Sequence, residues 1–198
     1  MRKKDCVIFC TCLFMILCFM PLKTEAASNK TKITKTINTF YKAAKTYNVG
    51  KMKNCFVRKS DLKAFVEMKE MANYCKKQNK NLKYEIKSIK INGKNATAKV
   101  KCKYMSAYNA IYNSFSDTIT YMILYDPNLS GRAINIKTYQ FFKKNLRYSP
   151  AVKKTRIVKF KLVKKGKAWK IEKGSRAIID TLSCDYESAY QNYFSQFD

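Results

Sequence analysis

The sequence contains no histidine, and it has only five glycines, three prolines and one tryptophan in 198 residues. Without histidine, the usual base of a nucleophilic triad and a frequent metal ligand are both missing. The glycines stand apart from one another, so no glycine-rich phosphate loop is present. We therefore expect no metal, no cofactor and no catalytic residues of these common designs.

Acidic residues are also scarce, because 13 Asp and Glu stand against 41 Lys and Arg, which gives a net charge of +28. A charge of this size attracts polyanions. The sequence therefore predicts an electrostatic association with an anionic cell-wall polymer or membrane surface. The alternative is that the lysines only keep the protein soluble, since specific phosphate sites usually recruit the arginine fork.

Residues 1–26 have the pattern of an export signal. Three charged residues, Arg2, Lys3 and Lys4, precede an apolar run over residues 6–20, and small residues follow at Ala26 and Ala27. The run is short for a membrane-spanning helix, although an uncleaved anchor stays the alternative. We therefore predict a secreted protein, in which residues 27–198 form a single domain with a net charge of +26.

Four cysteines remain beyond residue 26, namely Cys55, Cys75, Cys102 and Cys184. An even number in an exported protein permits disulfides, with three possible pairings. Cys75 and Cys102 fall on predicted buried faces, where a free thiol packs as a small hydrophobe. The sequence leaves both states of these cysteines open, disulfide-bonded or buried as free thiols. No two of them have the spacing of metal ligands.

The stretch over residues 152–172, VKKTRIVKFKLVKKGKAWKIE, alternates apolar and basic residues with the period of a β-strand. A two-residue turn at Lys165-Gly166 closes it into a hairpin. That turn puts two apolar pairs on one face, Leu162 opposite Trp169 and Phe160 opposite Ile171. Lysines occupy the other face, so one side of the sheet is expected to be buried and the other to face solvent.

Residues 82–104 predict a second hairpin that turns at Gly93-Lys94. The apolar phase of its first strand changes once, which predicts a β-bulge at Lys87-Ser88. Helical spacing predicts helices over residues 33–47, 60–75, 108–122, 133–146, 176–182 and 186–197. The fold class is therefore α+β, a curved antiparallel sheet of about four strands packed against N-terminal, inserted and C-terminal helices.

Three short sequence segments, in this order, resemble those of a known superfamily: INTFYKA at residues 37–43, IKINGKNATAKV at 89–100 and KKGKAWKI at 164–171. With them, the chain resembles the nuclear transport factor 2-like (cystatin-like) superfamily, and within it exported bacterial families of unknown function. The resemblance implies a curved sheet wrapped around helices, often with an apolar pocket. Some members of the superfamily are enzymes, and others bind ligands or proteins.

A small apolar ligand in such a pocket is an alternative function. Six aromatic residues are the candidates for lining it: Tyr41, Tyr84, Tyr104, Tyr108, Phe160 and Trp169. The same rings would equally serve as plain core packing. A lyase or isomerase built on a tyrosine–aspartate pair is a further alternative, with Asp117 and Asp180 as the acidic candidates, whereas Asp185 and Glu187 are expected on a helix surface.

Lysines on the solvent face of the sheet and at its turn are the candidate anion-binding residues: Lys99, Lys101, Lys103, Lys159, Lys161, Lys164, Lys165, Lys167 and Lys170. They would bind phosphate-rich polymers in a salt-sensitive way, or they would only keep exposed strands from pairing. No aromatic residue is interleaved among them, which disfavours nucleic acid. The sequence thus favours a secreted, basic, non-catalytic binding domain on an anionic cell envelope.

Overall fold

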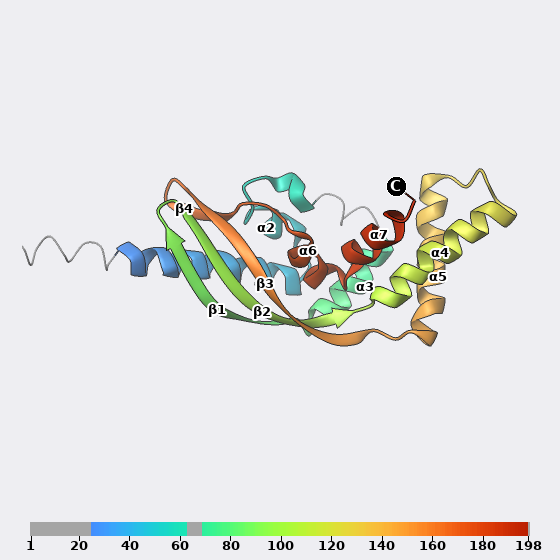
Figure 1. The fold of residues 1–198 in the computed structure, drawn as a ribbon, viewed down its shortest axis with the longest axis horizontal. Helices are drawn as coiled ribbons and strands as arrows, with labels where there is room; N and C mark the ends of the chain where they lie inside the picture. The colour runs from blue at the N-terminus through green and yellow to red at the C-terminus, as the bar shows by residue number, and fades with distance from the viewer. Residues whose placement is uncertain (1–24, 63–68, 198) are drawn as a thin grey trace, which may run out of the picture.

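The computed structural model describes residues 25–62 and 69–197. It shows an α+β fold in which helices pack on a curved, open, four-stranded antiparallel sheet (Figure 1), as predicted. After a helix over residues 25–45, the elements in chain order are α2 (Val49–Lys53), η1 (Lys59–Leu62), α3 (Lys69–Asn79), β1 (Lys83–Asn92), β2 (Asn95–Ser106), α4 (Tyr108–Tyr125), α5 (Gly131–Tyr148), β3 (Val152–Lys165), β4 (Ala168–Ile171), α6 (Arg176–Ser183) and α7 (Tyr186–Phe194).

The predicted signal segment lies outside the described residues except for its last two positions, 25 and 26, which begin the N-terminal helix. That helix is longer than expected, because the polar residues 28–32 are helical as well. The middle of the helix predicted over residues 60–75 also lies outside the described part of the chain. Its start is the short 3₁₀ helix η1, and its end belongs to α3.

The sheet has the strand order β1-β2-β3-β4, so each strand pairs with its neighbour in the sequence. The first hairpin is as predicted: Ile91 pairs with Ala96, Ile89 pairs with Ala98, and the register shifts between Ile86 and Ser88. The bulge lets both apolar phases of β1 face the same side.

The register of the second hairpin differs from the prediction. Leu162 pairs with Ile171 and Lys164 with Trp169, so the turn consists of Gly166 and Lys167 rather than Lys165 and Gly166. Gly166 has a φ of +59°, in the left-handed region that glycine adopts most easily. A turn with glycine at its first central position fits the twist of the strands. The register moves by two residues, so the predicted faces are unchanged.

The core lies between the inner face of the sheet and the N-terminal helix. Tyr41 of that helix stacks on Tyr84 at 4.4 Å between ring centroids and meets Phe160 edge-on at 5.8 Å. Trp169 is buried, and its indole N–H donates to Asn29 at 3.2 Å. The single tryptophan therefore joins the start of the N-terminal helix to β4.

Helices α4 and α5 form an arm beyond the end of the sheet (Figure 1). Their contact includes a hydrogen bond between the hydroxyls of Thr118 and Thr138 at 3.0 Å, and one from the amide of Asn145 to Asp117 at 2.9 Å. Phe115 of α4 packs against rings of α7. No helix within residues 25–62 and 69–197 has the length and apolar character that a bilayer crossing requires.

The four cysteines beyond residue 26 are all free and buried. Burial, and then the neighbouring Cys184 that follows α6, raise the pKa of the Cys75 thiol in α3. The hydroxyl of Tyr41 lies 2.9 Å from the sulfur of Cys102. In the structure the cysteines therefore act as small core residues, the second of the two alternatives that the sequence leaves open.

Candidate functional site

Two aspartates of the C-terminal helices are fully buried, Asp180 in α6 and Asp185 just before α7. Asp180 is one of the two acidic candidates from the sequence, whereas the expectation that Asp185 lies on a helix surface is wrong. The other candidate, Asp117, is partly buried and accepts a hydrogen bond from Asn145. Burying an ionised carboxylate is costly unless it is paired and hydrogen-bonded, so the partners of both groups matter.

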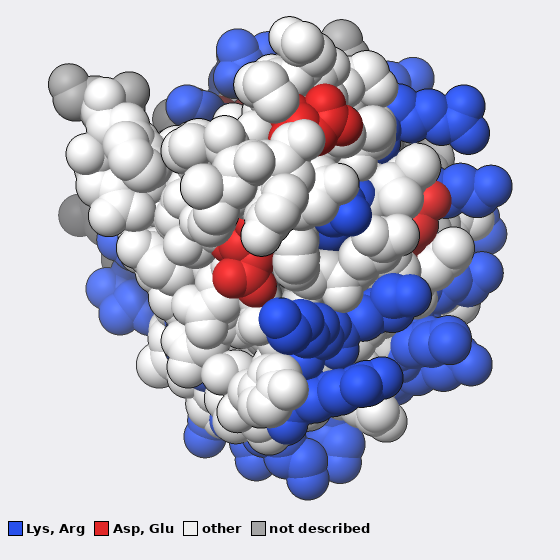
Figure 2. Space-filling model, turned by 90° about the vertical axis from the view of Figure 1, so that its right-hand side faces the viewer, with Lys and Arg blue, Asp and Glu red and all other residues white. Residues whose placement is uncertain are grey.

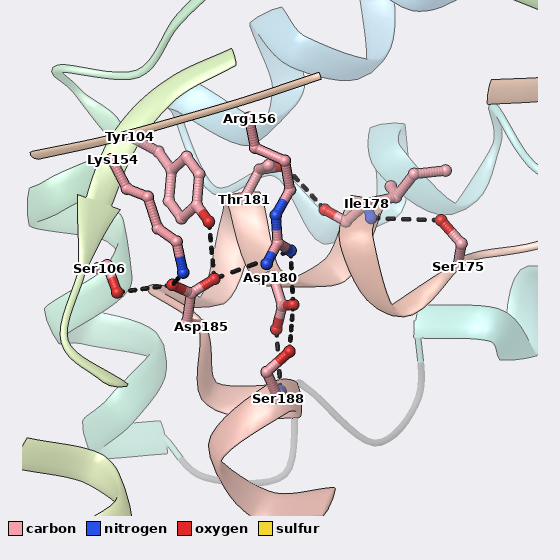
Figure 3. Close-up of polar contacts among 10 residues, drawn as sticks. All are labelled: Tyr104, Ser106, Lys154, Arg156, Ser175, Ile178, Asp180, Thr181, Asp185 and Ser188. Carbon is pink, nitrogen blue, oxygen red and sulfur yellow. Dashed lines mark hydrogen bonds and ion pairs between the residues drawn. The ribbon is translucent and has the colours of Figure 1, made fainter. Parts of the chain in front are cut away.

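The basic partners of both aspartates come from the start of β3. Its inner face carries Val158, Phe160 and Leu162 toward the hairpin end, and the same alternation places Arg156 and Lys154 on this face toward the start of the strand. Figure 3 shows both basic side chains reaching toward the two aspartates. The sheet therefore presents an apolar surface at one end and a cationic surface at the other.

Asp180 has three close donors. Arg156 donates from Nη1 to Oδ2 at 2.9 Å, and Ser188 of α7 donates its backbone N–H to Oδ1 at 2.9 Å and its hydroxyl to Oδ2 at 2.6 Å. The side chain of Arg156 keeps 29% of its surface exposed. The carboxylate thus joins α6 to β3 and to the first turn of α7 (Figure 3).

Asp185 also has three close donors, all from strands. The hydroxyls of Tyr104 and Ser106 donate at 2.7 and 2.6 Å, and the ammonium of Lys154 donates at 2.8 Å. Asp185 has a φ of +67° and follows Cys184 with a φ of +56°. Aspartate tolerates this left-handed conformation better than most residues, so it can form the tight corner between α6 and α7.

The environment keeps Tyr104 and Arg156 of this network protonated. Burial, and then the hydrogen bond to Asp185, raise the pKa of Tyr104. Burial by itself would lower the pKa of Arg156, but the hydrogen bond to Asp180 and the nearby acidic groups raise it. With three donors on each carboxylate, the arrangement suits electrostatic anchoring better than proton abstraction.

A hollow of about 590 Å³ lies beside Asp185. It is lined by Ser106, Ala107, Tyr108, Asn109, Tyr148, Ser149, Pro150, Val152 and Lys154. Ser106 and Lys154 contact Asp185 directly, so the buried carboxylate stands immediately behind the wall. The hydroxyl oxygen of Tyr108 accepts a hydrogen bond from Asn192, which leaves its own hydrogen available to a ligand.

The six aromatic candidates do not share one cavity. Tyr41, Tyr84 and Phe160 pack on one another in the core, and Tyr104 lies in the aspartate network. Tyr108 lines the hollow beside Asp185, whereas Trp169 lines a separate hollow of about 680 Å³. Whether any of these residues binds a ligand stays a prediction.

The predicted anion-binding lysines lie on the outer face of the sheet and around the second turn. Lys99 pairs directly with Lys159 across β2 and β3, and Lys159 and Lys161 line a third hollow, of about 720 Å³. Lys164 contacts Glu25, and Lys170 donates to the backbone of Asn54. Seen from the α4–α5 end, basic side chains gather along one side of the molecule, and acidic ones form small separate groups (Figure 2).

Sequence reasoning missed Lys154, Arg156, Ser106, Ser188 and Asp185. A signal for the first two was available, because extending the alternation of β3 back from Val158 puts Arg156 and then Lys154 on the buried face. A basic residue on a buried face requires an acidic partner. No group of three or more Cys, Asp or Glu side chains in the described part of the chain is placed to hold a metal ion.

Among the comparisons with known proteins, one family model matches part of the chain. No curated protein and no solved structure matches the chain. Residues 26–122, from the N-terminal helix into α4, match the model of a family described as "Putative lumazine-binding". This family has the nuclear transport factor 2-like fold, which supports the resemblance at the level of the fold, and its description indicates a ligand-binding domain.

Proposed function

We propose that the protein is a non-catalytic binding domain that takes a small heteroaromatic ligand in the hollow beside Asp185. The observation that carries this proposal is a cavity of about 590 Å³ with a lysine in its wall held by a buried carboxylate. Cavities of roughly 300–1,000 Å³ with few, well-placed polar groups are typical of small-molecule sites. The family description supports a ligand of the lumazine type.

The chemistry of the wall suits a flat molecule with carbonyl and ring-nitrogen acceptors. Lys154 uses one of its three N–H groups on Asp185, so the others remain for a ligand acceptor. The hydroxyl of Tyr108 and the amide of Asn109 add two further donors. The ring of Tyr148, 76% exposed at the end of α5, offers a flat apolar surface.

Titration of the full-length protein with lumazine, followed by the fluorescence of the ligand, tests the proposal. Tyr148→Ala should weaken binding about fivefold, because it removes a ring contact worth about 1 kcal/mol. Tyr125→Ala is the matched control, since Tyr125 is equally exposed, 74%, at the end of α4 but does not line this hollow. Equal affinities of the two variants, or no binding by the unmodified protein, would refute the proposal.

A second function is association with an anionic cell envelope, and the outer face of the sheet favours it. Lys99, Lys101 and Lys103 project from alternate positions of β2, and Lys159 stands directly opposite Lys99. Repulsion between such neighbours is relieved when an anionic polymer or lipid surface neutralises them. This attraction weakens with salt, because it acts between solvent-exposed groups.

Sedimentation with vesicles that contain phosphatidylglycerol, and with isolated cell wall, measures this association. Replacing Lys99, Lys101 and Lys103 by Gln should reduce retention at low salt several-fold. The control replaces Lys76, Lys77 and Lys80 of the α3 region, which are also exposed and change the net charge equally. Retention that persists in 0.5 M salt, or that falls equally in both variants, contradicts a role of this face.

Export precedes both functions in this proposal. The basic start and the apolar run over residues 6–20 support cleavage after Ala26 or Ala27. N-terminal sequencing of the protein from culture supernatant should then begin at Ala27 or Ser28. Recovery of the intact N-terminus in the membrane fraction would instead favour an anchor.

A further inference from the structure

Strand β3 is far longer than the strand that covers its outer edge. It has 14 residues, and β4 has four. Their pairing covers only Leu162 to Lys165. Next to it, one backbone bond from the N–H of Glu172 reaches the carbonyl of Lys161. Within the described residues, no strand pairs with the remaining edge over residues 152–160, which Figure 1 shows continuing past β4.

The backbone groups at this edge follow from strand geometry. The carbonyl of Lys161 points toward the β4 side, and the N–H of Lys164 points to the opposite side, where it bonds Lys94. Because these directions alternate along a strand, the odd-numbered residues present their N–H and C=O groups at the open edge. Among residues 25–62 and 69–197, Thr155, Ile157 and Lys159 therefore offer a row of donors and acceptors that no strand pairs with.

A hollow of about 720 Å³ runs beside this row. It is lined by Val57, Arg58, Ile157, Lys159, Lys161, Glu172, Lys173, Ser175 and Ala177. Four basic residues thus surround a single acidic one, over apolar contacts from Val57, Ile157 and Ala177. On the inner side of the same edge, Lys154 and Arg156 are already paired with Asp185 and Asp180.

We propose that the open edge of β3 binds an extended, acidic segment of a partner protein as a fifth strand. The backbone of the segment pairs with Thr155, Ile157 and Lys159, in the manner of strand addition to an exposed sheet edge. Side chains of an added strand alternate between the two faces. Lys159 and Lys161 make the outer face of this edge basic, whereas the basic residues of the inner face are already paired with buried aspartates. Carboxylates are therefore favoured on the outer face of the segment.

Charge also argues against a second copy of this chain as the occupant. Two such edges paired antiparallel about Phe160 would place Lys159 of each copy opposite Lys161 of the other, and like charges directly opposite destabilise strand pairing. Lysines on an edge are a common protection against self-association. The same lysines that repel a second copy attract an acidic strand, which makes the edge selective.

The probe for this proposal is a seven-residue peptide of alternating glutamate and valine, titrated against the full-length protein by calorimetry. We expect binding at low salt that weakens at least tenfold in 0.5 M salt, and no binding of the corresponding lysine peptide. A peptide N-methylated on alternate residues keeps its charge but loses backbone donors, so its affinity should fall at least tenfold. Equal binding of the plain and methylated peptides would overturn the proposal.

Position 157 offers a matched pair of variants. Ile157→Pro removes an N–H that faces the open edge and not β2, and proline is tolerated at such edge positions. Ile157→Ala removes the apolar side chain but keeps that N–H. The proline variant should bind the acidic peptide at least tenfold more weakly than the alanine variant; equal affinities would refute strand addition.

Sedimentation of the free protein tests whether a second copy of this chain occupies the edge instead. A dimer that Ile157→Pro dissolves would assign the edge to a second copy and overturn the proposal. The peptide series needs only the unmodified protein, so it decides the matter even if the proline variant fails to fold. Lumazine binding to the hollow beside Asp185 is measured separately, so either proposal can fail without the other.

Discussion

The two halves of the inner face of β3 are buried by different interactions. In the apolar half, toward the hairpin end, Val158, Phe160 and Leu162 are buried among apolar side chains. In the ionic half, toward the start of the strand, Lys154 and Arg156 reach buried aspartates. The apolar half is held by burial of surface from water, which needs no specific partner. The ionic half requires the right partner for each group, so it fixes the position of the α6–α7 corner.

The largest expected effect concerns the apolar half. Phe160→Ala removes a buried ring that meets Phe40 and Tyr41 edge-on at 5.8 Å. The cavity left behind should lower the free energy of unfolding by about 4 kcal/mol. Urea denaturation measures the loss; a loss below about 1 kcal/mol would show that this half is not the main core.

The ionic half should respond almost as strongly. Asp180→Ala leaves the N–H of Ser188 without its acceptor and the guanidinium of Arg156 with only the longer contact to Asp185 at 4.0 Å, at a cost of about 3 kcal/mol. Asp117→Ala is the control, because Asp117 is partly buried and accepts one hydrogen bond from Asn145. Its cost should stay below about 1 kcal/mol, and equal losses would remove the distinction between the two aspartates.

Alkaline pH tests the core between the sheet and the N-terminal helix through Cys102, whose sulfur meets Tyr41. Burial raises the pKa of this thiol to about 11, although the hydrogen bond with Tyr41 acts in the opposite direction. The folded state therefore keeps the proton longer than the unfolded state, so this stability is complete below about pH 9 and is lost as the pH rises toward 11.

Between pH 8 and 10.5, the unmodified protein should lose about 2 kcal/mol more than Cys102→Ala in urea denaturation. Parallel pH profiles of the two proteins would mean that the thiol is not protected by the core.

The sequence predicted the apolar half better than the ionic half, for physical reasons. The phase change in β1 locates the bulge, because one slip puts both apolar phases of the strand on the same side. The register of the second hairpin was missed by two residues. A shift of two keeps every side chain on its face, so hydrophobic alternation cannot detect it, and the turn geometry at Gly166 decides.

The aspartate network could not be read from local pattern. It joins Tyr104 of β2, Lys154 of β3 and Asp185 of the helical corner, which lie far apart in the sequence. Asp185 follows an apolar helix and precedes a tyrosine-rich one, where a surface position is the ordinary expectation. Only the left-handed backbone at Cys184 and Asp185 turns its carboxylate inward.

The smallest expected effect lies on the outer face of the sheet. Lys99→Glu replaces the repulsion from Lys159 with an attraction and should raise the free energy of unfolding by about 0.5 kcal/mol at low salt. Lys90→Glu is the control, because Lys90 faces Thr97. The gain should vanish in 1 M salt, and a gain that survives there would point to packing instead of charge.

A double-mutant cycle on Arg156 and Asp180 tests most directly whether specific ion pairs hold the ionic half. The cycle compares Arg156→Met, Asp180→Leu and the double variant by urea denaturation at pH 7. Each single variant leaves a buried or half-buried charge without its close partner, whereas the double variant removes both charges. We therefore predict a coupling energy of about 2 kcal/mol. A coupling below about 0.5 kcal/mol would contradict the account.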